Sequence, residues 1–280
     1  MAKTKLLSLL AGLLTGISAT AQNGTPVLQT DFTNGADHSA WTVADTNDDA
    51  LCWGYDADLL GYAYNGIGST AAANDWLVTP AFAVKAGSHY RVELTLARRG
   101  CRAADDLTIY HAEQRTPGAA GAAEVVHVTP DWQAGVATLR CDFQATGTSD
   151  QHYVMLHLQS AADNGILSLK SLRIVETDGQ QPLPAPDMTA YSDGNSGEVR
   201  LKWYNPNRDT EGAIITRPMT AIVTVDGTQV AALSGMQPGE MSAYTLTPTS
   251  FSGQHTYGVS LQLDNLTSDA VTRSLDLDDV

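Results

Sequence analysis

Regular alternation of apolar and polar residues is the feature that most constrains the fold of this chain. Residues 90–96 read YRVELTL, and residues 154–159 (VMLHLQ) and 257–263 (YGVSLQL) show the same period of two. In an extended strand this period places one face against a core and the other in water. No stretch keeps an apolar helical period over three turns, and turn pairs such as Asn65-Gly66 and Asp178-Gly179 are frequent. The sequence therefore predicts an all-β chain built from sandwiches or barrels.

Two local patterns predict details of these strands. Residues 167–170 alternate, but the phase changes at Ser171 before Leu172. A change of phase inside one strand indicates a β-bulge at that place. Asp226-Gly227 lies between the apolar residues Ile222, Val223 and Val225 on one side and Val230 on the other, which indicates a β-hairpin.

The first 21 residues have the features of a signal peptide. Lys3 and Lys5 precede an apolar run at residues 6–17, and Ala19-Thr20-Ala21 places small residues where a signal peptidase reads them. A membrane anchor is the alternative, but the run is shorter than the ~20 residues that span a bilayer. We expect cleavage after Ala21, with no membrane insertion afterwards. The mature protein would be secreted, held at the cell surface or periplasmic.

A proline-rich segment divides the rest of the chain. Residues 177–186 (TDGQQPLPAP) contain three prolines and predict a stiff, extended connector. We therefore expect one domain at residues 22–176 and a second at residues 187–280. The second, of roughly ninety residues, suits a small Ig-like sandwich.

The charge balance excludes several kinds of partner. The chain has 16 basic and 31 acidic residues, and the loss of Lys3 and Lys5 with the signal peptide leaves a net charge near −17. Nucleic acids and anionic membrane surfaces both need clustered cations, so neither is expected as a partner. The acidic balance is compatible with binding a cation.

The first domain resembles the cleaved-adhesin, or choice-of-anchor, jelly-roll domains of Bacteroidetes surface proteins, including those of gingipain–haemagglutinins. The most specific block is Asn74-Asp75-Trp76-Leu77-Val78-Thr79-Pro80. The other residues that carry the resemblance are Asp31-Phe32, Asn34-Gly35, Trp41, Asp45–Asp49, Trp53, Val84, Gly87 and the closing strand Leu167–Val175. The resemblance implies a jelly-roll β-sandwich, a role in binding host proteins or surfaces, and a likeness to carbohydrate-binding modules.

The second domain resembles fibronectin type III domains. Its landmarks are Pro184-Ala185-Pro186, Leu201-Lys202-Trp203, Asn205-Pro206 and Tyr257-Gly258-Val259. The resemblance implies a smaller Ig-like sandwich that acts as a spacer or as a protein-binding module. A fold alone does not determine a function.

An acidic loop is the candidate metal site. Asp45-x-Asn47-x-Asp49 alternates oxygen ligands as calcium loops do. An EF-hand is excluded because Ala50 replaces the required glycine and no flanking helices are predicted. We expect a structural Ca²⁺ held by this loop with Asp31, and the alternative is a solvated turn whose carboxylates cap backbone N–H groups. The resembled domains often carry an Asp-Asp pair in the last strand, where this chain has Lys170-Ser171, so that inherited metal site is in doubt.

Three aromatic residues are the candidate ligand contacts. Tyr62 and Tyr64 share a face if that segment is extended, and Trp132 follows Pro130-Asp131 in a loop-like context. Exposed aromatic rings stack on sugars or anchor protein partners. Trp41, Trp53, Trp76 and Trp203 are expected in the core.

The cysteines and histidines suggest no catalytic or metal cluster. Of Cys52, Cys101 and Cys141, the favoured disulfide is Cys101–Cys141, and three buried thiols are the alternative. The seven histidines are scattered and are expected at the surface. His111 and His127 flank an Ala/Gly-rich loop, and as a pair across a hairpin they could bind a transition metal.

The function expected from these patterns is non-enzymatic. The chain has no G-x-S-x-G, H-E-x-x-H, P-loop or dinucleotide-binding motif. A dispersed pair of glycosidase carboxylates stays open as an enzymatic alternative. We expect an exported binding or adhesion protein that recognises an extracellular glycan or protein through the jelly roll. The other alternative is a structural or assembly module of the cell envelope without a ligand of its own.

Overall fold

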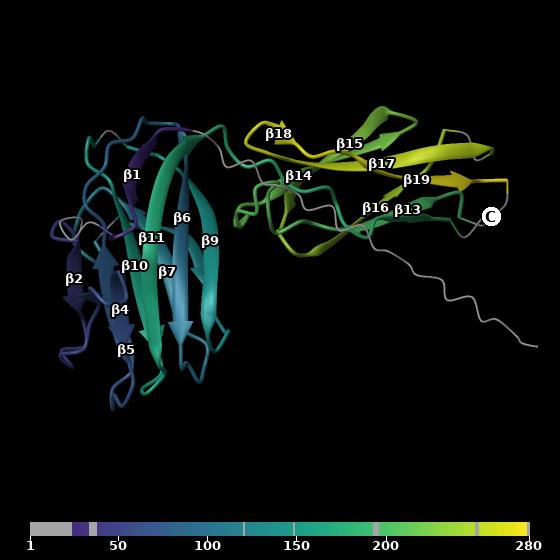
Figure 1. The fold of residues 1–280 in the computed structure, drawn as a ribbon. Coiled ribbons are helices and arrows are strands. Elements are labelled where there is room, and N and C mark those ends of the chain that lie inside the picture. The colour runs from purple at the N-terminus through teal and green to yellow at the C-terminus, as the bar shows by residue number, and fades with distance from the viewer. Residues whose placement is uncertain are drawn as a thin grey trace, which may run out of the picture.

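A computed structural model describes residues 24–33, 38–119, 121–147, 149–192, 196–249 and 252–278. The predicted signal peptide and Asn34-Gly35 lie outside these residues. The fold is all-β, a jelly-roll β-sandwich followed by a smaller Ig-like β-sandwich (Figure 1). Within the described ranges no helix is long and apolar enough to cross a membrane.

The first sandwich consists of two antiparallel sheets. One sheet has the order β3-β4-β11-β6-β9, with β1 also paired to β11, and the other has the order β2-β5-β10-β7-β8. The strands of the first sheet are β1 (Pro26–Thr30), β3 (Gly54–Asp56), β4 (Gly61–Asn65), β6 (His89–Arg99), β9 (Gly135–Gln144) and β11 (Ile166–Thr177). The strands of the second sheet are β2 (Thr42–Asp45), β5 (Ala73–Val78), β7 (Asp106–Ala112), β8 (Ala123–Val128) and β10 (Tyr153–Ser160).

The second sandwich also consists of two antiparallel sheets. The smaller sheet has the order β12-β13-β16 and the larger has the order β15-β14-β17-β18, with β19 also paired to β17. The smaller sheet contains β12 (Thr189–Tyr191), β13 (Val199–Tyr204) and β16 (Met241–Leu246). The larger sheet contains β14 (Met219–Val225), β15 (Thr228–Met236), β17 (Gln254–Leu263), β18 (Leu266–Thr267) and β19 (Val271–Asp276).

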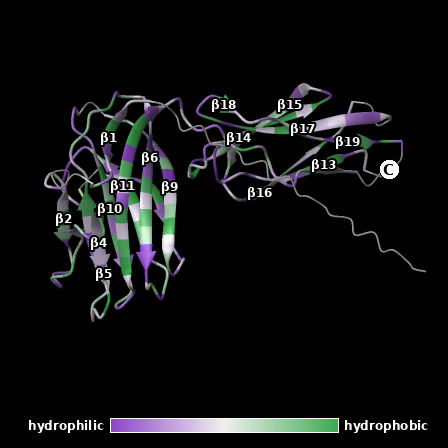
Figure 2. Ribbon diagram, viewed as in Figure 1, coloured by the Kyte–Doolittle hydropathy of each residue, from purple (hydrophilic) through white to green (hydrophobic). Residues whose placement is uncertain are grey.

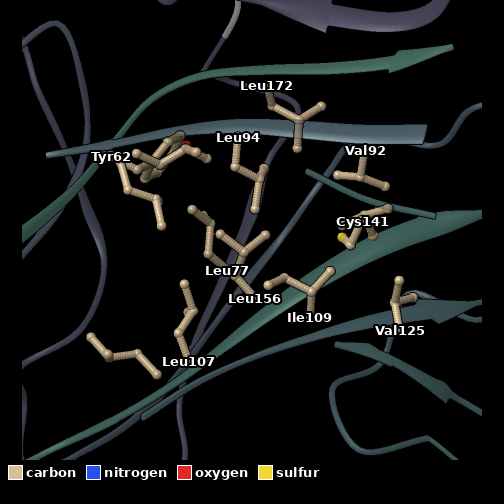
Figure 3. Close-up of a cluster of buried hydrophobic side chains, with 14 of the residues drawn as sticks. Tyr62, Leu77, Val92, Leu94, Leu107, Ile109, Val125, Cys141, Leu156 and Leu172 are labelled. Atoms are coloured by element: carbon tan, nitrogen blue, oxygen red, sulfur yellow. The ribbon is translucent and has the colours of Figure 1, made fainter. Parts of the chain in front are cut away.

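The predicted alternation decides which side chains form the first core. On β6, Tyr90, Val92, Leu94 and Leu96 are all at most 1% exposed. They pack between the two sheets with residues such as Leu77, Leu107 and Leu156 (Figure 3). Figure 2 shows apolar and polar residues alternating along β6, β9 and β11. Burying one such leucine stabilises the fold by about 1.5–3 kcal/mol.

Both local predictions about the strands are confirmed. The pairing of β11 with β6 shifts between Leu169 and Ser171, which is the predicted bulge. Asp226 and Gly227 join β14 to β15 with φ angles of 50° and 79°. Positive φ at both positions is what a two-residue type I′ hairpin requires.

Residues 205–218, between β13 and β14, contact the edge of the first sandwich. The Ile214 N–H donates to the carbonyl of Arg140 at 2.9 Å. At the same junction the buried Arg91 guanidinium donates to Asp142 at 2.8 Å and also pairs with Asp209. Arg91 and Asp142 lie on the outer face of the β3-β4-β11-β6-β9 sheet, so a buried ion network joins the two sandwiches at this point.

The favoured disulfide is wrong, because Cys52, Cys101 and Cys141 are all free thiols. Cys141 on β9 lies opposite Val92 in the middle of the sheet, whereas Cys101 follows the end of β6 at Arg99. The strand from Val92 to Arg99 spans about 23 Å. Disulfides need Cα atoms within about 7 Å of each other.

Candidate ligand-binding site

Trp132 is the one predicted ligand contact that the structure leaves accessible. It lies in the loop between β8 and β9, at the side of the first sandwich where its two sheets end, and its side chain is half-buried. The ring forms one wall of a cleft of about 210 Å³. The cleft is lined by Leu96, Val128, Thr129, Pro130, Asp131, Trp132, Ala137, Thr138, Leu139, Arg208 and Ile214.

A buried cation anchors the loop that carries Trp132. Arg98 follows the inward-facing series of β6, and its side chain is 0% exposed. It donates to the carboxylate of Asp105 at 2.8 Å and to the backbone carbonyls of Trp132 and Ala103. Its guanidinium carbon also lies 5.6 Å from the centroid of the Trp132 ring, within cation–π range. The Arg98 side chain therefore holds both the backbone and the ring of Trp132.

Further hydrogen bonds complete the anchoring. Asp105 accepts from the Nδ2 of Asn164 at 2.8 Å, and its own N–H donates to the Pro130 carbonyl at 3.0 Å. The N–H of Cys101 donates to the carbonyl of Gln133 at 3.2 Å. These bonds fix the conformation of the loop in the absence of a ligand, so less conformational entropy is lost on binding.

The chemistry of the cleft is that of a small binding site. Its floor is apolar, one wall is aromatic, and Thr129, Asp131, Thr138 and Arg208 supply polar groups. Its volume is below the roughly 300–1,000 Å³ of sites that enclose a drug-sized ligand. The cleft therefore suits a single ring or side chain of a larger ligand that stays mostly in solvent.

The expected exposure of Tyr62 and Tyr64 is wrong. They do share a face of β4, but that face points into the core, and the two side chains are 4% and 3% exposed. Figure 3 shows Tyr62 among the buried side chains. Tyr62 packs edge-on against Phe32, and its hydroxyl donates to the His38 carbonyl at 2.8 Å. Burial raises the pKa of Tyr64 to about 12. The alternation of residues along the strand shows that the two rings share a face. It does not show which face of the strand the second sheet covers.

The acidic loop has the arrangement of the alternative interpretation, a turn capped by its own carboxylates. Asp45 accepts from the N–H groups of Asn47 at 3.2 Å and Ala50 at 2.9 Å. Asp49 accepts from the Leu51 N–H at 2.7 Å and from the Asn47 side chain at 2.9 Å. Asp31 instead accepts from the backbone and hydroxyl of Thr33, which hold the pKa of that carboxyl below its usual range. No three His, Cys, Asp or Glu side chains in the described part of the chain converge as a formed metal site.

Asp75, a residue of the block that carries the adhesin resemblance, is a buried carboxylate beside this loop. It lies directly opposite Asp45 in the pairing of β2 with β5, and it is 0% exposed. One carboxylate oxygen accepts from the Asn74 N–H at 3.1 Å, and the other has no hydrogen-bond partner among the described residues. Burial, reinforced by Asp45 and Asp49, raises the pKa of Asp75 to about 6. An aspartate within an otherwise apolar strand pattern was the signal available in the sequence.

The prediction of surface histidines fails for two of the seven. His111 and His152 are 5% and 1% exposed, and their ring nitrogens lie 2.9 Å apart. Burial, with a smaller effect of His152, lowers the pKa of His111 to about 4. His127 contacts Asp106 instead, at 2.7 Å, and shows no pairing with His111. The buried pair is therefore a packing feature of β7 and the start of β10.

Comparisons with known proteins return only structural matches. No family model and no curated protein matches the chain. One similar solved structure is the K3 cleaved adhesin domain of Lys-gingipain from Porphyromonas gingivalis W83, at 12% identity and TM-score 0.42, covering 54% of this chain and 98% of that one. The cleaved-adhesin resemblance predicted from the sequence is present among these matches.

Two further matches are carbohydrate-binding modules. A CBM4 structure matches at 13% identity and TM-score 0.33, covering 50% of this chain and 96% of that one. The CBM22-1 xylan-binding domain of Paenibacillus barcinonensis Xyn10C matches at 14% identity and TM-score 0.40, covering 56% and 97%. At these identities and TM-scores nothing about function is carried over to this chain.

Proposed function

We propose that this chain is an exported, non-enzymatic protein that binds an extracellular glycan at the Trp132 cleft, which the first sandwich forms together with Arg208 and Ile214 of the segment between β13 and β14. The observation that carries the proposal is the half-buried Trp132 ring, which lines an apolar cleft and is held by the buried Arg98. Rigid aromatic anchors of this kind dominate binding energies.

The lining of the cleft favours a sugar ring as the occupant. A pyranose has an apolar face that stacks on an aromatic ring and hydroxyl groups at its rim. Thr129, Asp131 and Thr138 supply donors and acceptors around Trp132 for such hydroxyl groups. An apolar side chain of an extracellular protein is the second candidate, because the floor formed by Val128 and Leu139 also suits it.

The cleft lacks the pair of groups that glycoside hydrolysis needs. A glycosidase holds two carboxylates about 5–10 Å apart across the scissile bond. Asp131 is the single carboxylate among the residues that line this cleft. This supports a binding role over a hydrolytic one.

A glycan array followed by calorimetry on the mature chain tests the proposal. We expect Trp132→Ala to weaken binding by about tenfold or more, and Trp132→Phe to retain most of it. Val136→Ala is the matched control, since Val136 is 68% exposed two residues before the cleft residue Thr138 and does not line the cleft. Binding that survives Trp132→Ala unchanged would contradict the proposal. Capture of envelope proteins alone, with no glycan bound, would favour the assembly-module alternative.

Asp75 supports a second proposal, a structural Ca²⁺ bound between its buried carboxylate and the acidic loop, for which Asp45 and Asp49 must first leave the turn that they cap. The unpartnered oxygen of Asp75 is the observation that fits a cation, because a buried carboxylate normally has its lone pairs satisfied. Hard cations such as Ca²⁺ take six to eight oxygen ligands, and Asn47 can supply another. Asp45 and Asp49 would exchange backbone N–H bonds for the ion. Asp31 is not part of this proposed site, because its carboxylate bonds to Thr33 and only Asp45 and Asp49 act on the charge of Asp75.

A further inference from the structure

The outer face of the β12-β13-β16 sheet carries the most exposed aromatic side chains of the described chain. Tyr191 and Tyr204 are 38% and 45% exposed, and no other described Phe, Tyr or Trp reaches these values. Met241 on the same face is 58% exposed. Figure 1 shows β13 and β16 on the side of the second sandwich away from β14 and β17. We call this surface the tyrosine face.

Strand pairing places two cations between the two tyrosines. Tyr191 lies opposite Arg200, and Tyr204 lies opposite Met241. Arg200, Lys202 and Tyr204 follow one another at every second position of β13, about 7 Å apart on the same face. The Lys202 ammonium lies 5.6 Å from the centroid of the Tyr191 ring. The face therefore places two aromatic rings and two positive charges close together on β12 and β13.

These charges are available to a partner. Lys202 is exposed and forms no ion pair with any residue that the structure describes. Arg200 contacts Glu198 only at 3.6 Å, with both side chains about half exposed, and such surface pairs contribute little. The chain as a whole has a net charge of −15, whereas this face presents two accessible cations. Charge complementarity selects an anionic partner.

The shape of the face favours a polysaccharide over a peptide. Thr189, Ala243 and Thr245 are the remaining residues of the face, and all three are short. They form no walls of a groove that would select peptide side chains, and Tyr204 is 45% exposed beside them. A sugar ring can stack on Tyr204 while carboxylates on neighbouring sugars reach Arg200 and Lys202, and Lys202 already lies over the Tyr191 ring.

We propose that the tyrosine face binds an anionic polysaccharide that contains uronic acids. None of the residues of the tyrosine face lines the Trp132 cleft, so this second site does not depend on the first. The interaction combines ring stacking with charge attraction, so it weakens as salt rises.

Calorimetry and affinity electrophoresis of the mature chain with polygalacturonate test the proposal. We expect Lys202→Gln and Tyr204→Ala each to weaken binding by roughly threefold to tenfold, and the double variant to abolish it. Tyr204→Phe should bind nearly as well as the unchanged protein, since it keeps the ring. Arg273→Gln is the matched control, because Arg273 is an exposed cation on β19, in the other sheet.

The outcomes separate this site from the first one. Binding that Trp132→Ala leaves intact and the face variants remove supports the proposal. Three results would overturn it: no binding of polygalacturonate, an equal loss in Arg273→Gln, or loss in Trp132→Ala alone. Polyglutamate that binds as tightly as polygalacturonate would show that the face binds negative charge whether or not sugar rings are present. That result would also overturn the proposal.

Discussion

Replacing Arg98 by methionine is the sharpest test of how the Trp132 loop is held. Arg98 and Asp105 are 0% and 4% exposed and lie 2.8 Å apart. Arg98→Met keeps much of the side-chain volume but leaves the Asp105 carboxylate buried without its cation. Removing one partner of a buried pair costs about 3–5 kcal/mol. That is a large part of the 5–15 kcal/mol by which most domains are stable.

The second partner then gives an internal check. Arg98→Met combined with Asp105→Asn removes both charges, so we expect the double variant to regain much of the lost stability, because an uncharged replacement of a buried pair is often nearly neutral. Urea unfolding followed by circular dichroism measures both. Lys85→Met is the control, since Lys85 forms an exposed pair with Glu176 and should change the free energy of unfolding by less than about 1 kcal/mol.

We expect the double variant to regain stability but not ligand binding. Both Arg98 variants lose the hydrogen bond to the Trp132 carbonyl and the cation beside its ring. We expect weaker ligand binding in the double variant even at temperatures where it is fully folded. The reasoning is refuted if Arg98→Met unfolds within 1 kcal/mol of the unchanged protein, or if the double variant is no more stable than the single one.

Two further predictions concern titration and cations. The folded-state pKa of His111, about 4, lies below the unfolded value near 6.5. The stability it contributes is therefore complete above pH 6.5 and is lost as the pH falls through 4, by about 3 kcal/mol in total. In urea unfolding at pH 7 and pH 4.5, His111→Gln should lose less stability on acidification; equal losses would contradict this. If Ca²⁺ binds at Asp75, Ca²⁺ raises the melting temperature relative to chelator, and Asp75→Asn removes the increase; an unchanged increase in the variant would exclude Asp75 as a ligand.

Local sequence patterns determined much of the fold. The period of two, the bulge at Ser171 and the hairpin at Asp226-Gly227 could all be predicted, because each depends on neighbouring residues and on backbone geometry. The position of the Arg98 cation beside Trp132 could not be predicted in this way. Arg98 reads as one more residue at the end of a strand, and its partner Asp105 meets it only after the chain turns back.

The sequence by itself determined that this chain forms strands with one apolar face each, and which residues share a face. Only the tertiary structure decided which of those faces is covered. The packing of the two sheets of the first sandwich buries Tyr62 and Tyr64 of β4, whereas Tyr191 and Tyr204 lie on the outer face of β12 and β13 and stay in solvent. The physical reason is that alternation is a local property of a strand, whereas burial depends on strands more than a hundred residues apart meeting in one sandwich.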